Sequence, residues 1–313
     1  MAKAELTVIL PNMASLVQQE INQHIFPEIF NKVLKKASFT ADETSLERRL
    51  INHFTTAPQT TSDLPIANLR SEQKNVLCAD PCYLHADRDR LLLLSDSLEI
   101  TKEEANELIS AIQPLLTEFG ANLENYNSEQ WFISLKAMPD LDFTALAEVN
   151  GKAVHNYLPI GDEQTRLAWL RLWNEIQMHL FDLPLNEQRQ QQGKLPINSL
   201  WFWGKGELNV QPQAWQTTVG SNVLLQQLAK QANVDHKAVI EQTDMRFTSG
   251  KHLIVFEPLD LEGYWQQQLA AIDQIVAIMW QQLKWNKVAK VNLEIPNYGC
   301  YQLTPFNCWK PWT

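Results

Sequence analysis

Hydrophobic positions along the chain change their spacing repeatedly, from every second residue to every third or fourth. A spacing of two over a short stretch predicts a β-strand, and helical spacing over a longer stretch predicts an amphipathic helix. The predicted strands are 5–11, 74–79, 90–94, 131–135, 198–204, 252–256 and 288–295. The predicted helices are 14–36 with a kink or break at Pro27, 101–118, 162–181, 185–192, 221–231 and 261–284. Strands that alternate with long helices predict an α/β fold with a largely parallel sheet.

The segment from 90 to 135 has a shorter pattern of strand, helix and strand, which is typical of a small α+β module. Thr101 and Glu104 form a capping-box pattern at the start of its helix, and Gly120 is a natural helix stop. We therefore expect an α/β core made of residues 1–80 and 195–313. Residues 81–194 are expected to form an inserted α+β module with a helical connection.

The strand 198–204 runs into the turn Gly204-Lys205-Gly206. It has large side chains on both faces, with Trp201 and Trp203 on one of them, so a buried strand is predicted. The turn has two interpretations: a tight turn that closes a core strand, or the edge of an anion pocket. In the second, Lys205 and backbone N–H groups face the anion. That pocket would also include Asn186, Arg189 and Asn198.

A second group of charged residues runs from Asp80 to Arg90 and includes His85. If this segment is extended, Arg88 and Arg90 share one face, and Asp87 lies on the other. Two arginines so placed could hold an anionic metabolite or the carboxylates of a partner through bidentate contacts. Alternatively, the alternating charges satisfy one another and fasten the strand to its surroundings.

Composition narrows the class of partner. The chain carries 36 acidic and 26 basic residues, for a formal net charge of −10. This charge argues against non-specific binding to nucleic acid or to an anionic membrane surface. No apolar stretch is long enough to span a membrane, and residues 1–13 have the pattern of a strand rather than of a signal peptide. We therefore expect a cytoplasmic protein.

Cysteine and aromatic residues add two weaker indications. Four cysteines in 313 residues are too few for a disulfide framework: Cys78, Cys82, Cys300 and Cys308. The first two could hold a metal together with His85, but ordinary reduced thiols are the favoured interpretation. Aromatic residues near element or chain ends could form a surface for a protein partner, although burial is their commoner fate: Tyr264, Trp265, Trp309 and Trp312.

Four longer segments carry a family resemblance: 79–94, 97–112, 174–196 and 197–206. In order and spacing they resemble bacterial regulatory proteins of the RpfE type, which are also described as phosphoglycerate-mutase-like. A more distant resemblance is to the archaeal-type cofactor-independent phosphoglycerate mutases of the alkaline phosphatase superfamily. The positions that match this second pattern are Pro184, Asn186, Gly193, Asn198, Trp201, Trp203, Gly204 and Gly206. The resemblance implies a three-layer, mostly parallel α/β core of alkaline-phosphatase-like type, with a small inserted domain.

The mutase resemblance also implies a metal site, whose ligands this chain does not carry at the expected positions. Members of that superfamily transfer phosphoryl groups with two divalent metals, held by Asp and His, and a Ser or Thr nucleophile. The chain has Asn12 where an Asp would follow the first strand, and Tyr264 where a His would stand. Residues 293–299 lack the Asp-His pair that would follow a later strand.

The missing ligands predict a non-catalytic regulatory protein, or one that binds an anionic metabolite, on a degenerate mutase-like scaffold. It is expected to have no catalytic residue, metal or cofactor, and its partners are expected to be a small anion or another protein. The alternative is a metal-dependent phosphoglycerate mutase or phosphatase whose ligands lie elsewhere in the chain. A third hypothesis is a protein-interaction module that uses the aromatic C-terminus.

Overall fold

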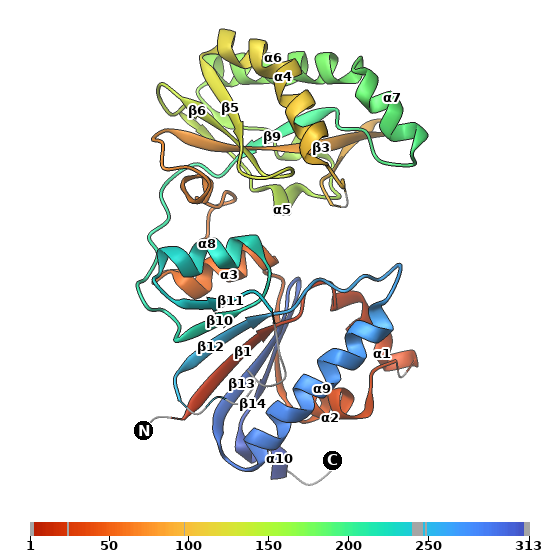
Figure 1. Ribbon diagram of the computed structural model, residues 1–313, viewed down its shortest axis with the longest axis vertical. Coiled ribbons are helices and arrows are strands. Elements are labelled where there is room, and N and C mark those ends of the chain that lie inside the picture. Colours follow the sequence, from red (N-terminus) through yellow and green to blue (C-terminus); the bar gives the residue numbers. More distant parts are fainter. Residues whose placement is uncertain (1–2, 24, 97, 240–246, 248, 310–313) are drawn as a thin grey trace. The chain divides into compact units, whose positions relative to one another are not determined.

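The computed structural model describes residues 3–23, 25–96, 98–239, 247 and 249–309. The chain divides into two compact units, which Figure 1 shows as ribbons. Residues 1–58 and 209–313 form one of them, here called the split unit, and residues 59–208 form the inserted unit. The chain passes from one unit to the other twice, after Pro58 and after Leu208.

These unit boundaries differ from the predicted ones, which lie at 80/81 and 194/195. The difference arises because β3 (Val76–Asp87) and β9 (Ser199–Trp203) pair with each other as antiparallel neighbours. Both strands therefore belong to the sheet of the inserted unit. All five residues of β9 are buried, as predicted, but the strand does not lie in the parallel sheet.

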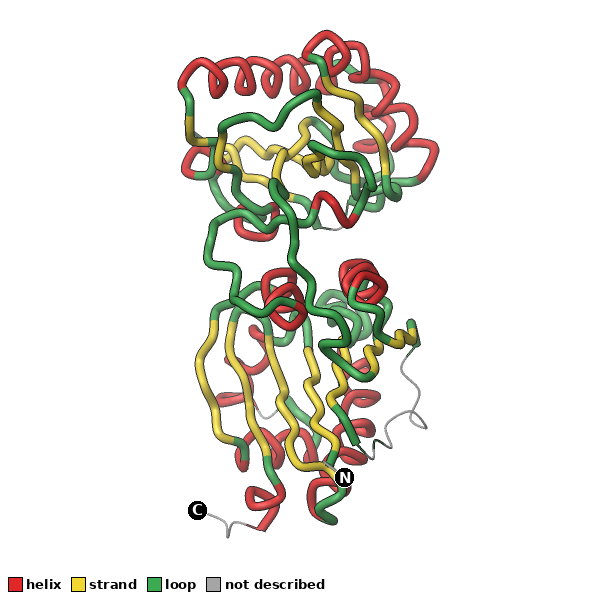
Figure 2. The backbone as a smooth tube through the Cα atoms, turned by 90° about the vertical axis from the view of Figure 1, so that its left-hand side faces the viewer, coloured by secondary structure: helices red, strands yellow, loops and turns green. Residues whose placement is uncertain are grey.

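The split unit contains a seven-stranded sheet in the order β11-β10-β12-β1-β13-β14-β2. Its strands are β1 (Ala4–Ile9), β2 (Ser38–Asp42), β10 (Thr217–Val219), β11 (Asp235–Lys237), β12 (Lys251–Val255), β13 (Val288–Ile295) and β14 (Tyr298–Leu303). Each pair of neighbours along β11-β10-β12-β1-β13 is parallel, whereas β14 pairs antiparallel with both β13 and β2. Figure 2 shows these strands side by side. The prediction of an α/β fold with a mostly parallel sheet is confirmed.

Helices cover both faces of this sheet. The apolar core on one face is shared with α1 (Ala14–Gln23), α2 (Glu28–Lys36) and α9 (Trp265–Lys284), while α10 (Pro305–Trp309) packs beside α9. Leu293 and Ile295 belong to that core, but Glu294 between them contacts α3 (Leu46–Phe54). Because successive strand residues point to opposite faces, α3 covers the other face, with α8 (Val223–Gln231) against it. The split unit thus has three layers.

The inserted unit contains an antiparallel sheet in which β3 is the longest strand. Its partners are β4 (Arg90–Leu94), β6 (Trp131–Leu135) and β9, and β5 (Ala121–Asn125) pairs with β6. The helices α4 (Lys102–Phe119), α6 (Glu163–Phe181) and α7 (Pro184–Gln191) lie on one side of the sheet in Figure 1. The shorter elements are α5 (Leu146–Val149), the paired strands β7 (Leu141–Asp142) and β8 (Ile160–Gly161), and two 3₁₀ turns, Ala67–Leu69 and Val154–Asn156.

The predicted end signals are confirmed at the helices α4 and α2. Thr101 and Glu104 form a reciprocal capping box at α4, and Gly120 ends that helix with φ +88°. Pro27 caps α2 and divides the predicted helix 14–36 into α1 and α2. Among the described residues, no helix is both long and apolar enough to cross a membrane.

Candidate functional site

The glycine turn after β9 is closed by a carboxylate from the chain itself. Gly204 N–H donates to both oxygens of Asp63, at 2.8 and 3.0 Å, and Lys205 N–H donates to Asp63 Oδ2 at 2.8 Å. Leu64 N–H adds a third donor to Asp63 at 2.9 Å. Gly204 has φ +85°, and a Cβ there would lie 2.7 Å from Cys78 Sγ, so this position requires glycine. The turn therefore presents N–H groups to an anion, but that anion is Asp63.

The electrostatics of this turn follow from its partial burial. Burial raises the pKa of Asp63, and the hydrogen bonds from Gly204, Lys205 and Leu64 offset only part of that rise. The Lys205 ammonium donates to the Leu141 carbonyl oxygen at 2.9 Å. The backbone N–H and the ammonium group of Lys205 are thus both hydrogen-bonded within the inserted unit. Asp63 lies among the polar, turn-rich residues 54–65, where no motif identifies it as the partner of this turn.

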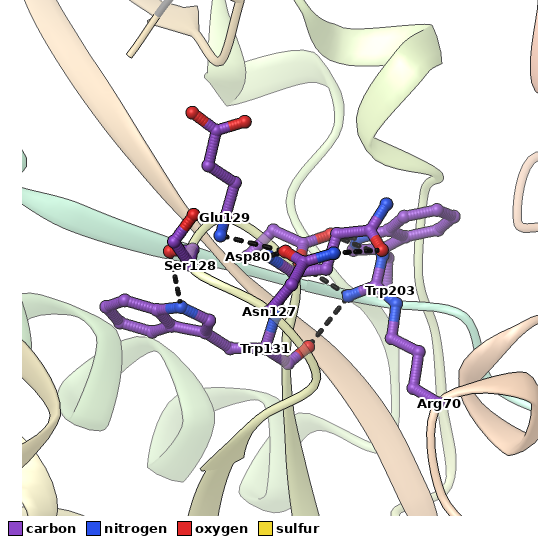
Figure 3. Close-up of polar contacts among 8 residues, drawn as sticks. Arg70, Asp80, Asn127, Ser128, Glu129, Trp131 and Trp203 are labelled. Atoms are coloured by element: carbon purple, nitrogen blue, oxygen red, sulfur yellow. Dashed lines mark hydrogen bonds and ion pairs between the residues drawn. The ribbon is translucent and has the colours of Figure 1, made fainter. Parts of the chain in front are cut away.

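Below the turn, Asp80 is the centre of a buried network (Figure 3). Arg70 forms a two-point ion pair with its carboxylate, with Nη2 3.0 Å from Oδ2. The indole N–H of Trp203 donates to Oδ2 at 2.8 Å, and the backbone N–H of Trp131 donates to Oδ1 at 3.0 Å. Asn127 orders the preceding turn by accepting N–H groups from Glu129 and Gln130. The two oxygens of Asp80 are therefore fully used inside the fold.

Arg70 completes this network and could not be predicted from the sequence. Its Nη1 also donates to the Trp131 carbonyl oxygen at 2.8 Å, and its guanidinium lies 5.5 Å from the ring centre of Trp203. Burial alone would lower the pKa of Arg70, but the charge of Asp80 outweighs it and the pKa is raised. A buried pair held in this way fastens the start of β3 to β6 and β9.

The arginines predicted beside Asp80 lie at the tip of the β3–β4 hairpin. Arg88 has φ +56° in the turn, so the segment is not extended there and Arg88 does not share a strand face with Arg90. Arg90 pairs with Asp87 at 3.2 Å, and both side chains are exposed. His85, also exposed, contacts the Tyr83 hydroxyl at 3.2 Å. Arg90 and Asp87 thus satisfy each other at the hairpin tip.

The other predicted pocket residues bind backbone groups inside the inserted unit. Asn186 donates to the carbonyl oxygens of Leu180 and Ile197 and accepts from Ile197 N–H. Arg189 is completely buried, contacts Glu104 Oε1 at 2.8 Å, and donates to the carbonyl oxygens of Leu195 and Leu98. Asn198 pairs with the backbone of Leu84, and Trp201 donates to the Thr144 carbonyl oxygen at 2.8 Å. Gly206, the last residue of the glycine turn, has φ +112° and is exposed.

Cys78, Cys82 and His85 cannot converge on one metal. The two cysteines lie on the same face of β3, whereas His85 is an odd number of residues away and exposed. Burial raises the pKa of both thiols, which keeps them protonated. Within the described part of the chain, no group of three or more His, Cys, Asp or Glu side chains is arranged to hold a metal.

In the split unit, the carboxyl ends of the parallel strands carry few candidate metal ligands among the described residues. Asn12 follows β1 with φ +58°, and Glu257 follows β12 and accepts a hydrogen bond from the Ser221 hydroxyl. Tyr264 caps α9 and is exposed. The Asp235-His236 pair lies in β11.

Glu294, at the end of β13, is already paired. Arg49 Nη1 lies 3.3 Å and His53 Nε2 2.8 Å from Glu294 Oε2, and Arg49 also reaches Asp42 at 3.1 Å. Burial alone would raise the pKa of Glu294, but His53 and Arg49 outweigh it and the pKa is lowered. These two residues on α3 were not predicted, because residues 37–53 received no structural prediction. These residues therefore do not fit the two-metal site that the resemblance implies.

Comparison with known proteins gives partial matches. No family model matches the chain. It is 35% identical over 60 residues to a Geobacter sulfurreducens protein described as a probable 2,3-bisphosphoglycerate-independent phosphoglycerate mutase, covering 19% of this chain and 14% of that protein. It is 26% identical over 114 residues to the 2,3-bisphosphoglycerate-independent phosphoglycerate mutase of Methanothrix thermoacetophila, covering 36% and 28%. The aligned part thus spans less than a third of either relative.

Two solved structures align over most of the chain. One is the cofactor-independent phosphoglycerate mutase of Thermoplasma acidophilum, with a TM-score of 0.44, 14% identity, and coverage of 96% of this chain and 90% of that one. The other is a protein of Pyrococcus horikoshii, with a TM-score of 0.48, 11% identity, and coverage of 96% and 86%. By the two sequence matches, the chain has distant similarity to 2,3-bisphosphoglycerate-independent phosphoglycerate mutases. The finer resemblance to RpfE-type proteins stays a prediction.

Proposed function

We propose that this chain is a non-catalytic cytoplasmic protein of the RpfE type, which acts in regulation or binds an anionic metabolite on a phosphoglycerate-mutase-like scaffold. The observation that carries the proposal is the set of side chains at the carboxyl ends of β1, β12 and β13. In α/β sheets this edge is where ligands and catalytic groups gather. Here it carries Asn12, Glu257 and Asp260, whose carboxylate accepts the N–H groups of Gly263 and Tyr264, and a Glu294 that is paired with Arg49 and His53.

The chemistry of phosphoryl transfer explains why that set matters. Without cations the negative charge of the transferring group is not offset, and two cations need several Asp and His ligands. Glu257, which is exposed and accepts from Ser221, is one carboxylate at this edge, and Glu294 is committed to α3. This set of side chains therefore argues against two-metal phosphoryl transfer at this edge. The alternative, a metal-dependent phosphoglycerate mutase or phosphatase, is favoured only by the sequence similarity to mutases.

The anion itself would be recognised at the Gly204 turn in the inserted unit. Two adjacent N–H groups converge there on a carboxylate, which is the geometry by which backbone nests bind anions. An incoming anion would have to displace Asp63, so binding at this turn would be coupled to movement of the loop that carries Asp63.

The deciding experiment measures metal retention and mutase activity on the same sample. The full chain is incubated with Mn²⁺ and Zn²⁺, desalted, analysed for bound metal, and assayed for interconversion of 3-phosphoglycerate and 2-phosphoglycerate. We expect less than one metal per chain and no turnover above a Glu257→Gln variant. About two retained metals per chain, with turnover that Glu257→Gln abolishes, would overturn the proposal and favour the enzyme. A cofactor-independent mutase run in parallel serves as the positive control.

A further inference from the structure

Helix α6 of the inserted unit is apolar on two opposite faces. Its inner face, which includes Trp169 and Ile176, is buried. On its outer face Leu167, Met178 and Phe181 are 55, 64 and 75% exposed. A helix that is apolar on both faces is normally covered on both. The outer face of α6 is therefore a candidate contact surface of this unit.

The apolar residues of the outer face are placed symmetrically along the helix. Leu167 and Phe181 lie seven residues before and after Asn174. Met178 lies four residues after it, and Leu170, which is half-buried at the edge of this face, lies four residues before it. Separations of four and seven correspond to about one and two helical turns, so all five residues fall on one stripe. We call these five residues the outer stripe. Asn174, at its centre, is exposed.

We propose that the outer stripe is the contact surface of a homodimer, in which α6 of one copy packs antiparallel against α6 of a second copy. A two-fold axis through the level of Asn174 brings Leu167 onto Phe181 of the other copy, and Leu170 onto the level of Met178. The two Asn174 amides then meet on the axis, where each can donate to the other. This inference is independent of the proposed function.

The charges beside the stripe favour the antiparallel arrangement. Arg171 and Glu175 lie on the same flank of the stripe, one on each side of the level of Asn174. In an antiparallel pair this flank faces the same flank of the second copy, so each Arg171 comes within reach of the other copy's Glu175. In a parallel pair this flank would face the opposite one, which carries Arg166. Arg166 lies about 7.5 Å along the helix from the level of Arg171, so neither Arg171 nor Glu175 would face an opposite charge, and the parallel arrangement lacks these pairs.

The first test is the mass of the full chain in solution, measured by light scattering and sedimentation over about a hundred-fold range of concentration. The chain mass is 36.0 kDa, so we expect a species of twice that mass at the higher concentrations. Phe181→Glu should weaken the dimer at least about tenfold, because it places charges against apolar side chains. The matched control is Trp285→Glu, an equally exposed aromatic (72%) at the end of α9, which should leave the dimer unchanged.

A charge swap tests the orientation. Arg171→Glu and Glu175→Arg should each weaken the dimer, and the double variant should restore it. Asn174→Cys should join two copies through a short bismaleimide. Gln164→Cys should not, because the two thiols would lie roughly 30 Å apart along the helices. Circular dichroism of each variant checks the fold.

Three results would overturn the proposal. The first is a wild-type chain that is monomeric at every concentration. The second is a dimer that Phe181→Glu does not weaken, which would place the interface elsewhere. The third is a charge swap that fails to restore association, which would exclude the antiparallel arrangement.

Discussion

Asp63 occupies the position that a bound anion would take at the turn after β9. Removing its carboxylate leaves the N–H groups of Gly204 and Lys205 without an acceptor, at a cost of about 2 kcal/mol. We predict that Asp63→Ala lowers the melting temperature and that inorganic phosphate restores part of the loss. The wild-type chain should respond to phosphate less, because Asp63 competes for the same donors. Thermal-shift titrations with phosphate and with 3-phosphoglycerate measure both effects.

The matched control is Asp87→Ala, which removes an exposed carboxylate at the hairpin tip and should not change the response to phosphate. Equal stabilisation of the wild-type chain and of Asp63→Ala would mean that the anion binds elsewhere. The same comparison also tests whether the Asp63 loop opens. A large response of Asp63→Ala with none from the wild type indicates a turn that its own side chain keeps closed.

At the scale of elements, the contacts of Glu294 with Arg49 and His53 fasten α3 to β13. The pKa of Glu294 is lowered in the fold, so its contribution to stability is present above the pKa of an unfolded glutamate and is lost as the pH falls through the folded value. We predict that Glu294→Gln lowers the free energy of unfolding by about 3 kcal/mol at neutral pH. The difference from wild type should shrink below about pH 4. Urea unfolding at a series of pH values measures it.

Glu5→Gln is the control for this variant, because Glu5 is an exposed carboxylate on the same sheet. It should change the stability little at any pH. A difference between Glu294→Gln and wild type that stayed constant down to about pH 3 would show that the carboxylate charge does not provide the stabilisation.

Elements with strong local signals could be predicted, and those defined by distant partners could not. The capping box and Gly120 define α4 from within its own sequence. By contrast, β10 and β11 have three residues each, too few to show a period. β2 is exposed or half-buried along its whole length, so it shows no alternation. Its place in the sheet depends on β14, more than 250 residues further along the chain.

The candidate site was harder to predict because its residues, too, are brought together by partners far apart in the sequence. The turn Gly204-Lys205-Gly206 was found as an N–H-rich turn, but its partner Asp63 lies in a polar loop with no motif. Arg70 and Asp80 are ten residues apart in sequence, and only the pairing of β3 with β6 and β9 buries them together. The placing of β9 in the wrong sheet has a related cause. A strand buried on both faces is typical of a parallel core, but β9 is covered on both faces within an antiparallel sheet.

At the scale of the whole molecule, the chain passes between the units at two segments, after Pro58 and after Leu208. Within each unit these two segments are joined by hydrogen bonds. In the split unit Thr55 bridges to Val210, and Gln211 N–H donates to the Phe54 carbonyl oxygen at 2.7 Å. In the inserted unit Asp63 binds the Gly204 turn. Because its entry and exit lie side by side, we predict that residues 59–208 fold alone. Cooperative unfolding by circular dichroism and dispersed amide signals by NMR would measure this.

The fragment 81–194 provides a sharp control. It lacks β9 and cuts β3 at Asp80, so it should remain unfolded. If this shorter fragment unfolded as cooperatively as 59–208, the strand pairing of β3 with β9 would not be essential to the inserted unit.

The central position of β1 has a consequence for the order of events on the ribosome. Its neighbours β12 and β13 begin at Lys251 and Val288, so β1 emerges first and waits for both. All strands of the inserted sheet are synthesised by Trp203, well before those partners appear. The inserted unit can therefore complete its fold during synthesis, while the split unit closes only after Val288–Ile295 has emerged. A chain that stalls between Leu208 and Lys251 carries an apolar β1 without partners, and that nascent state is the one most exposed to aggregation.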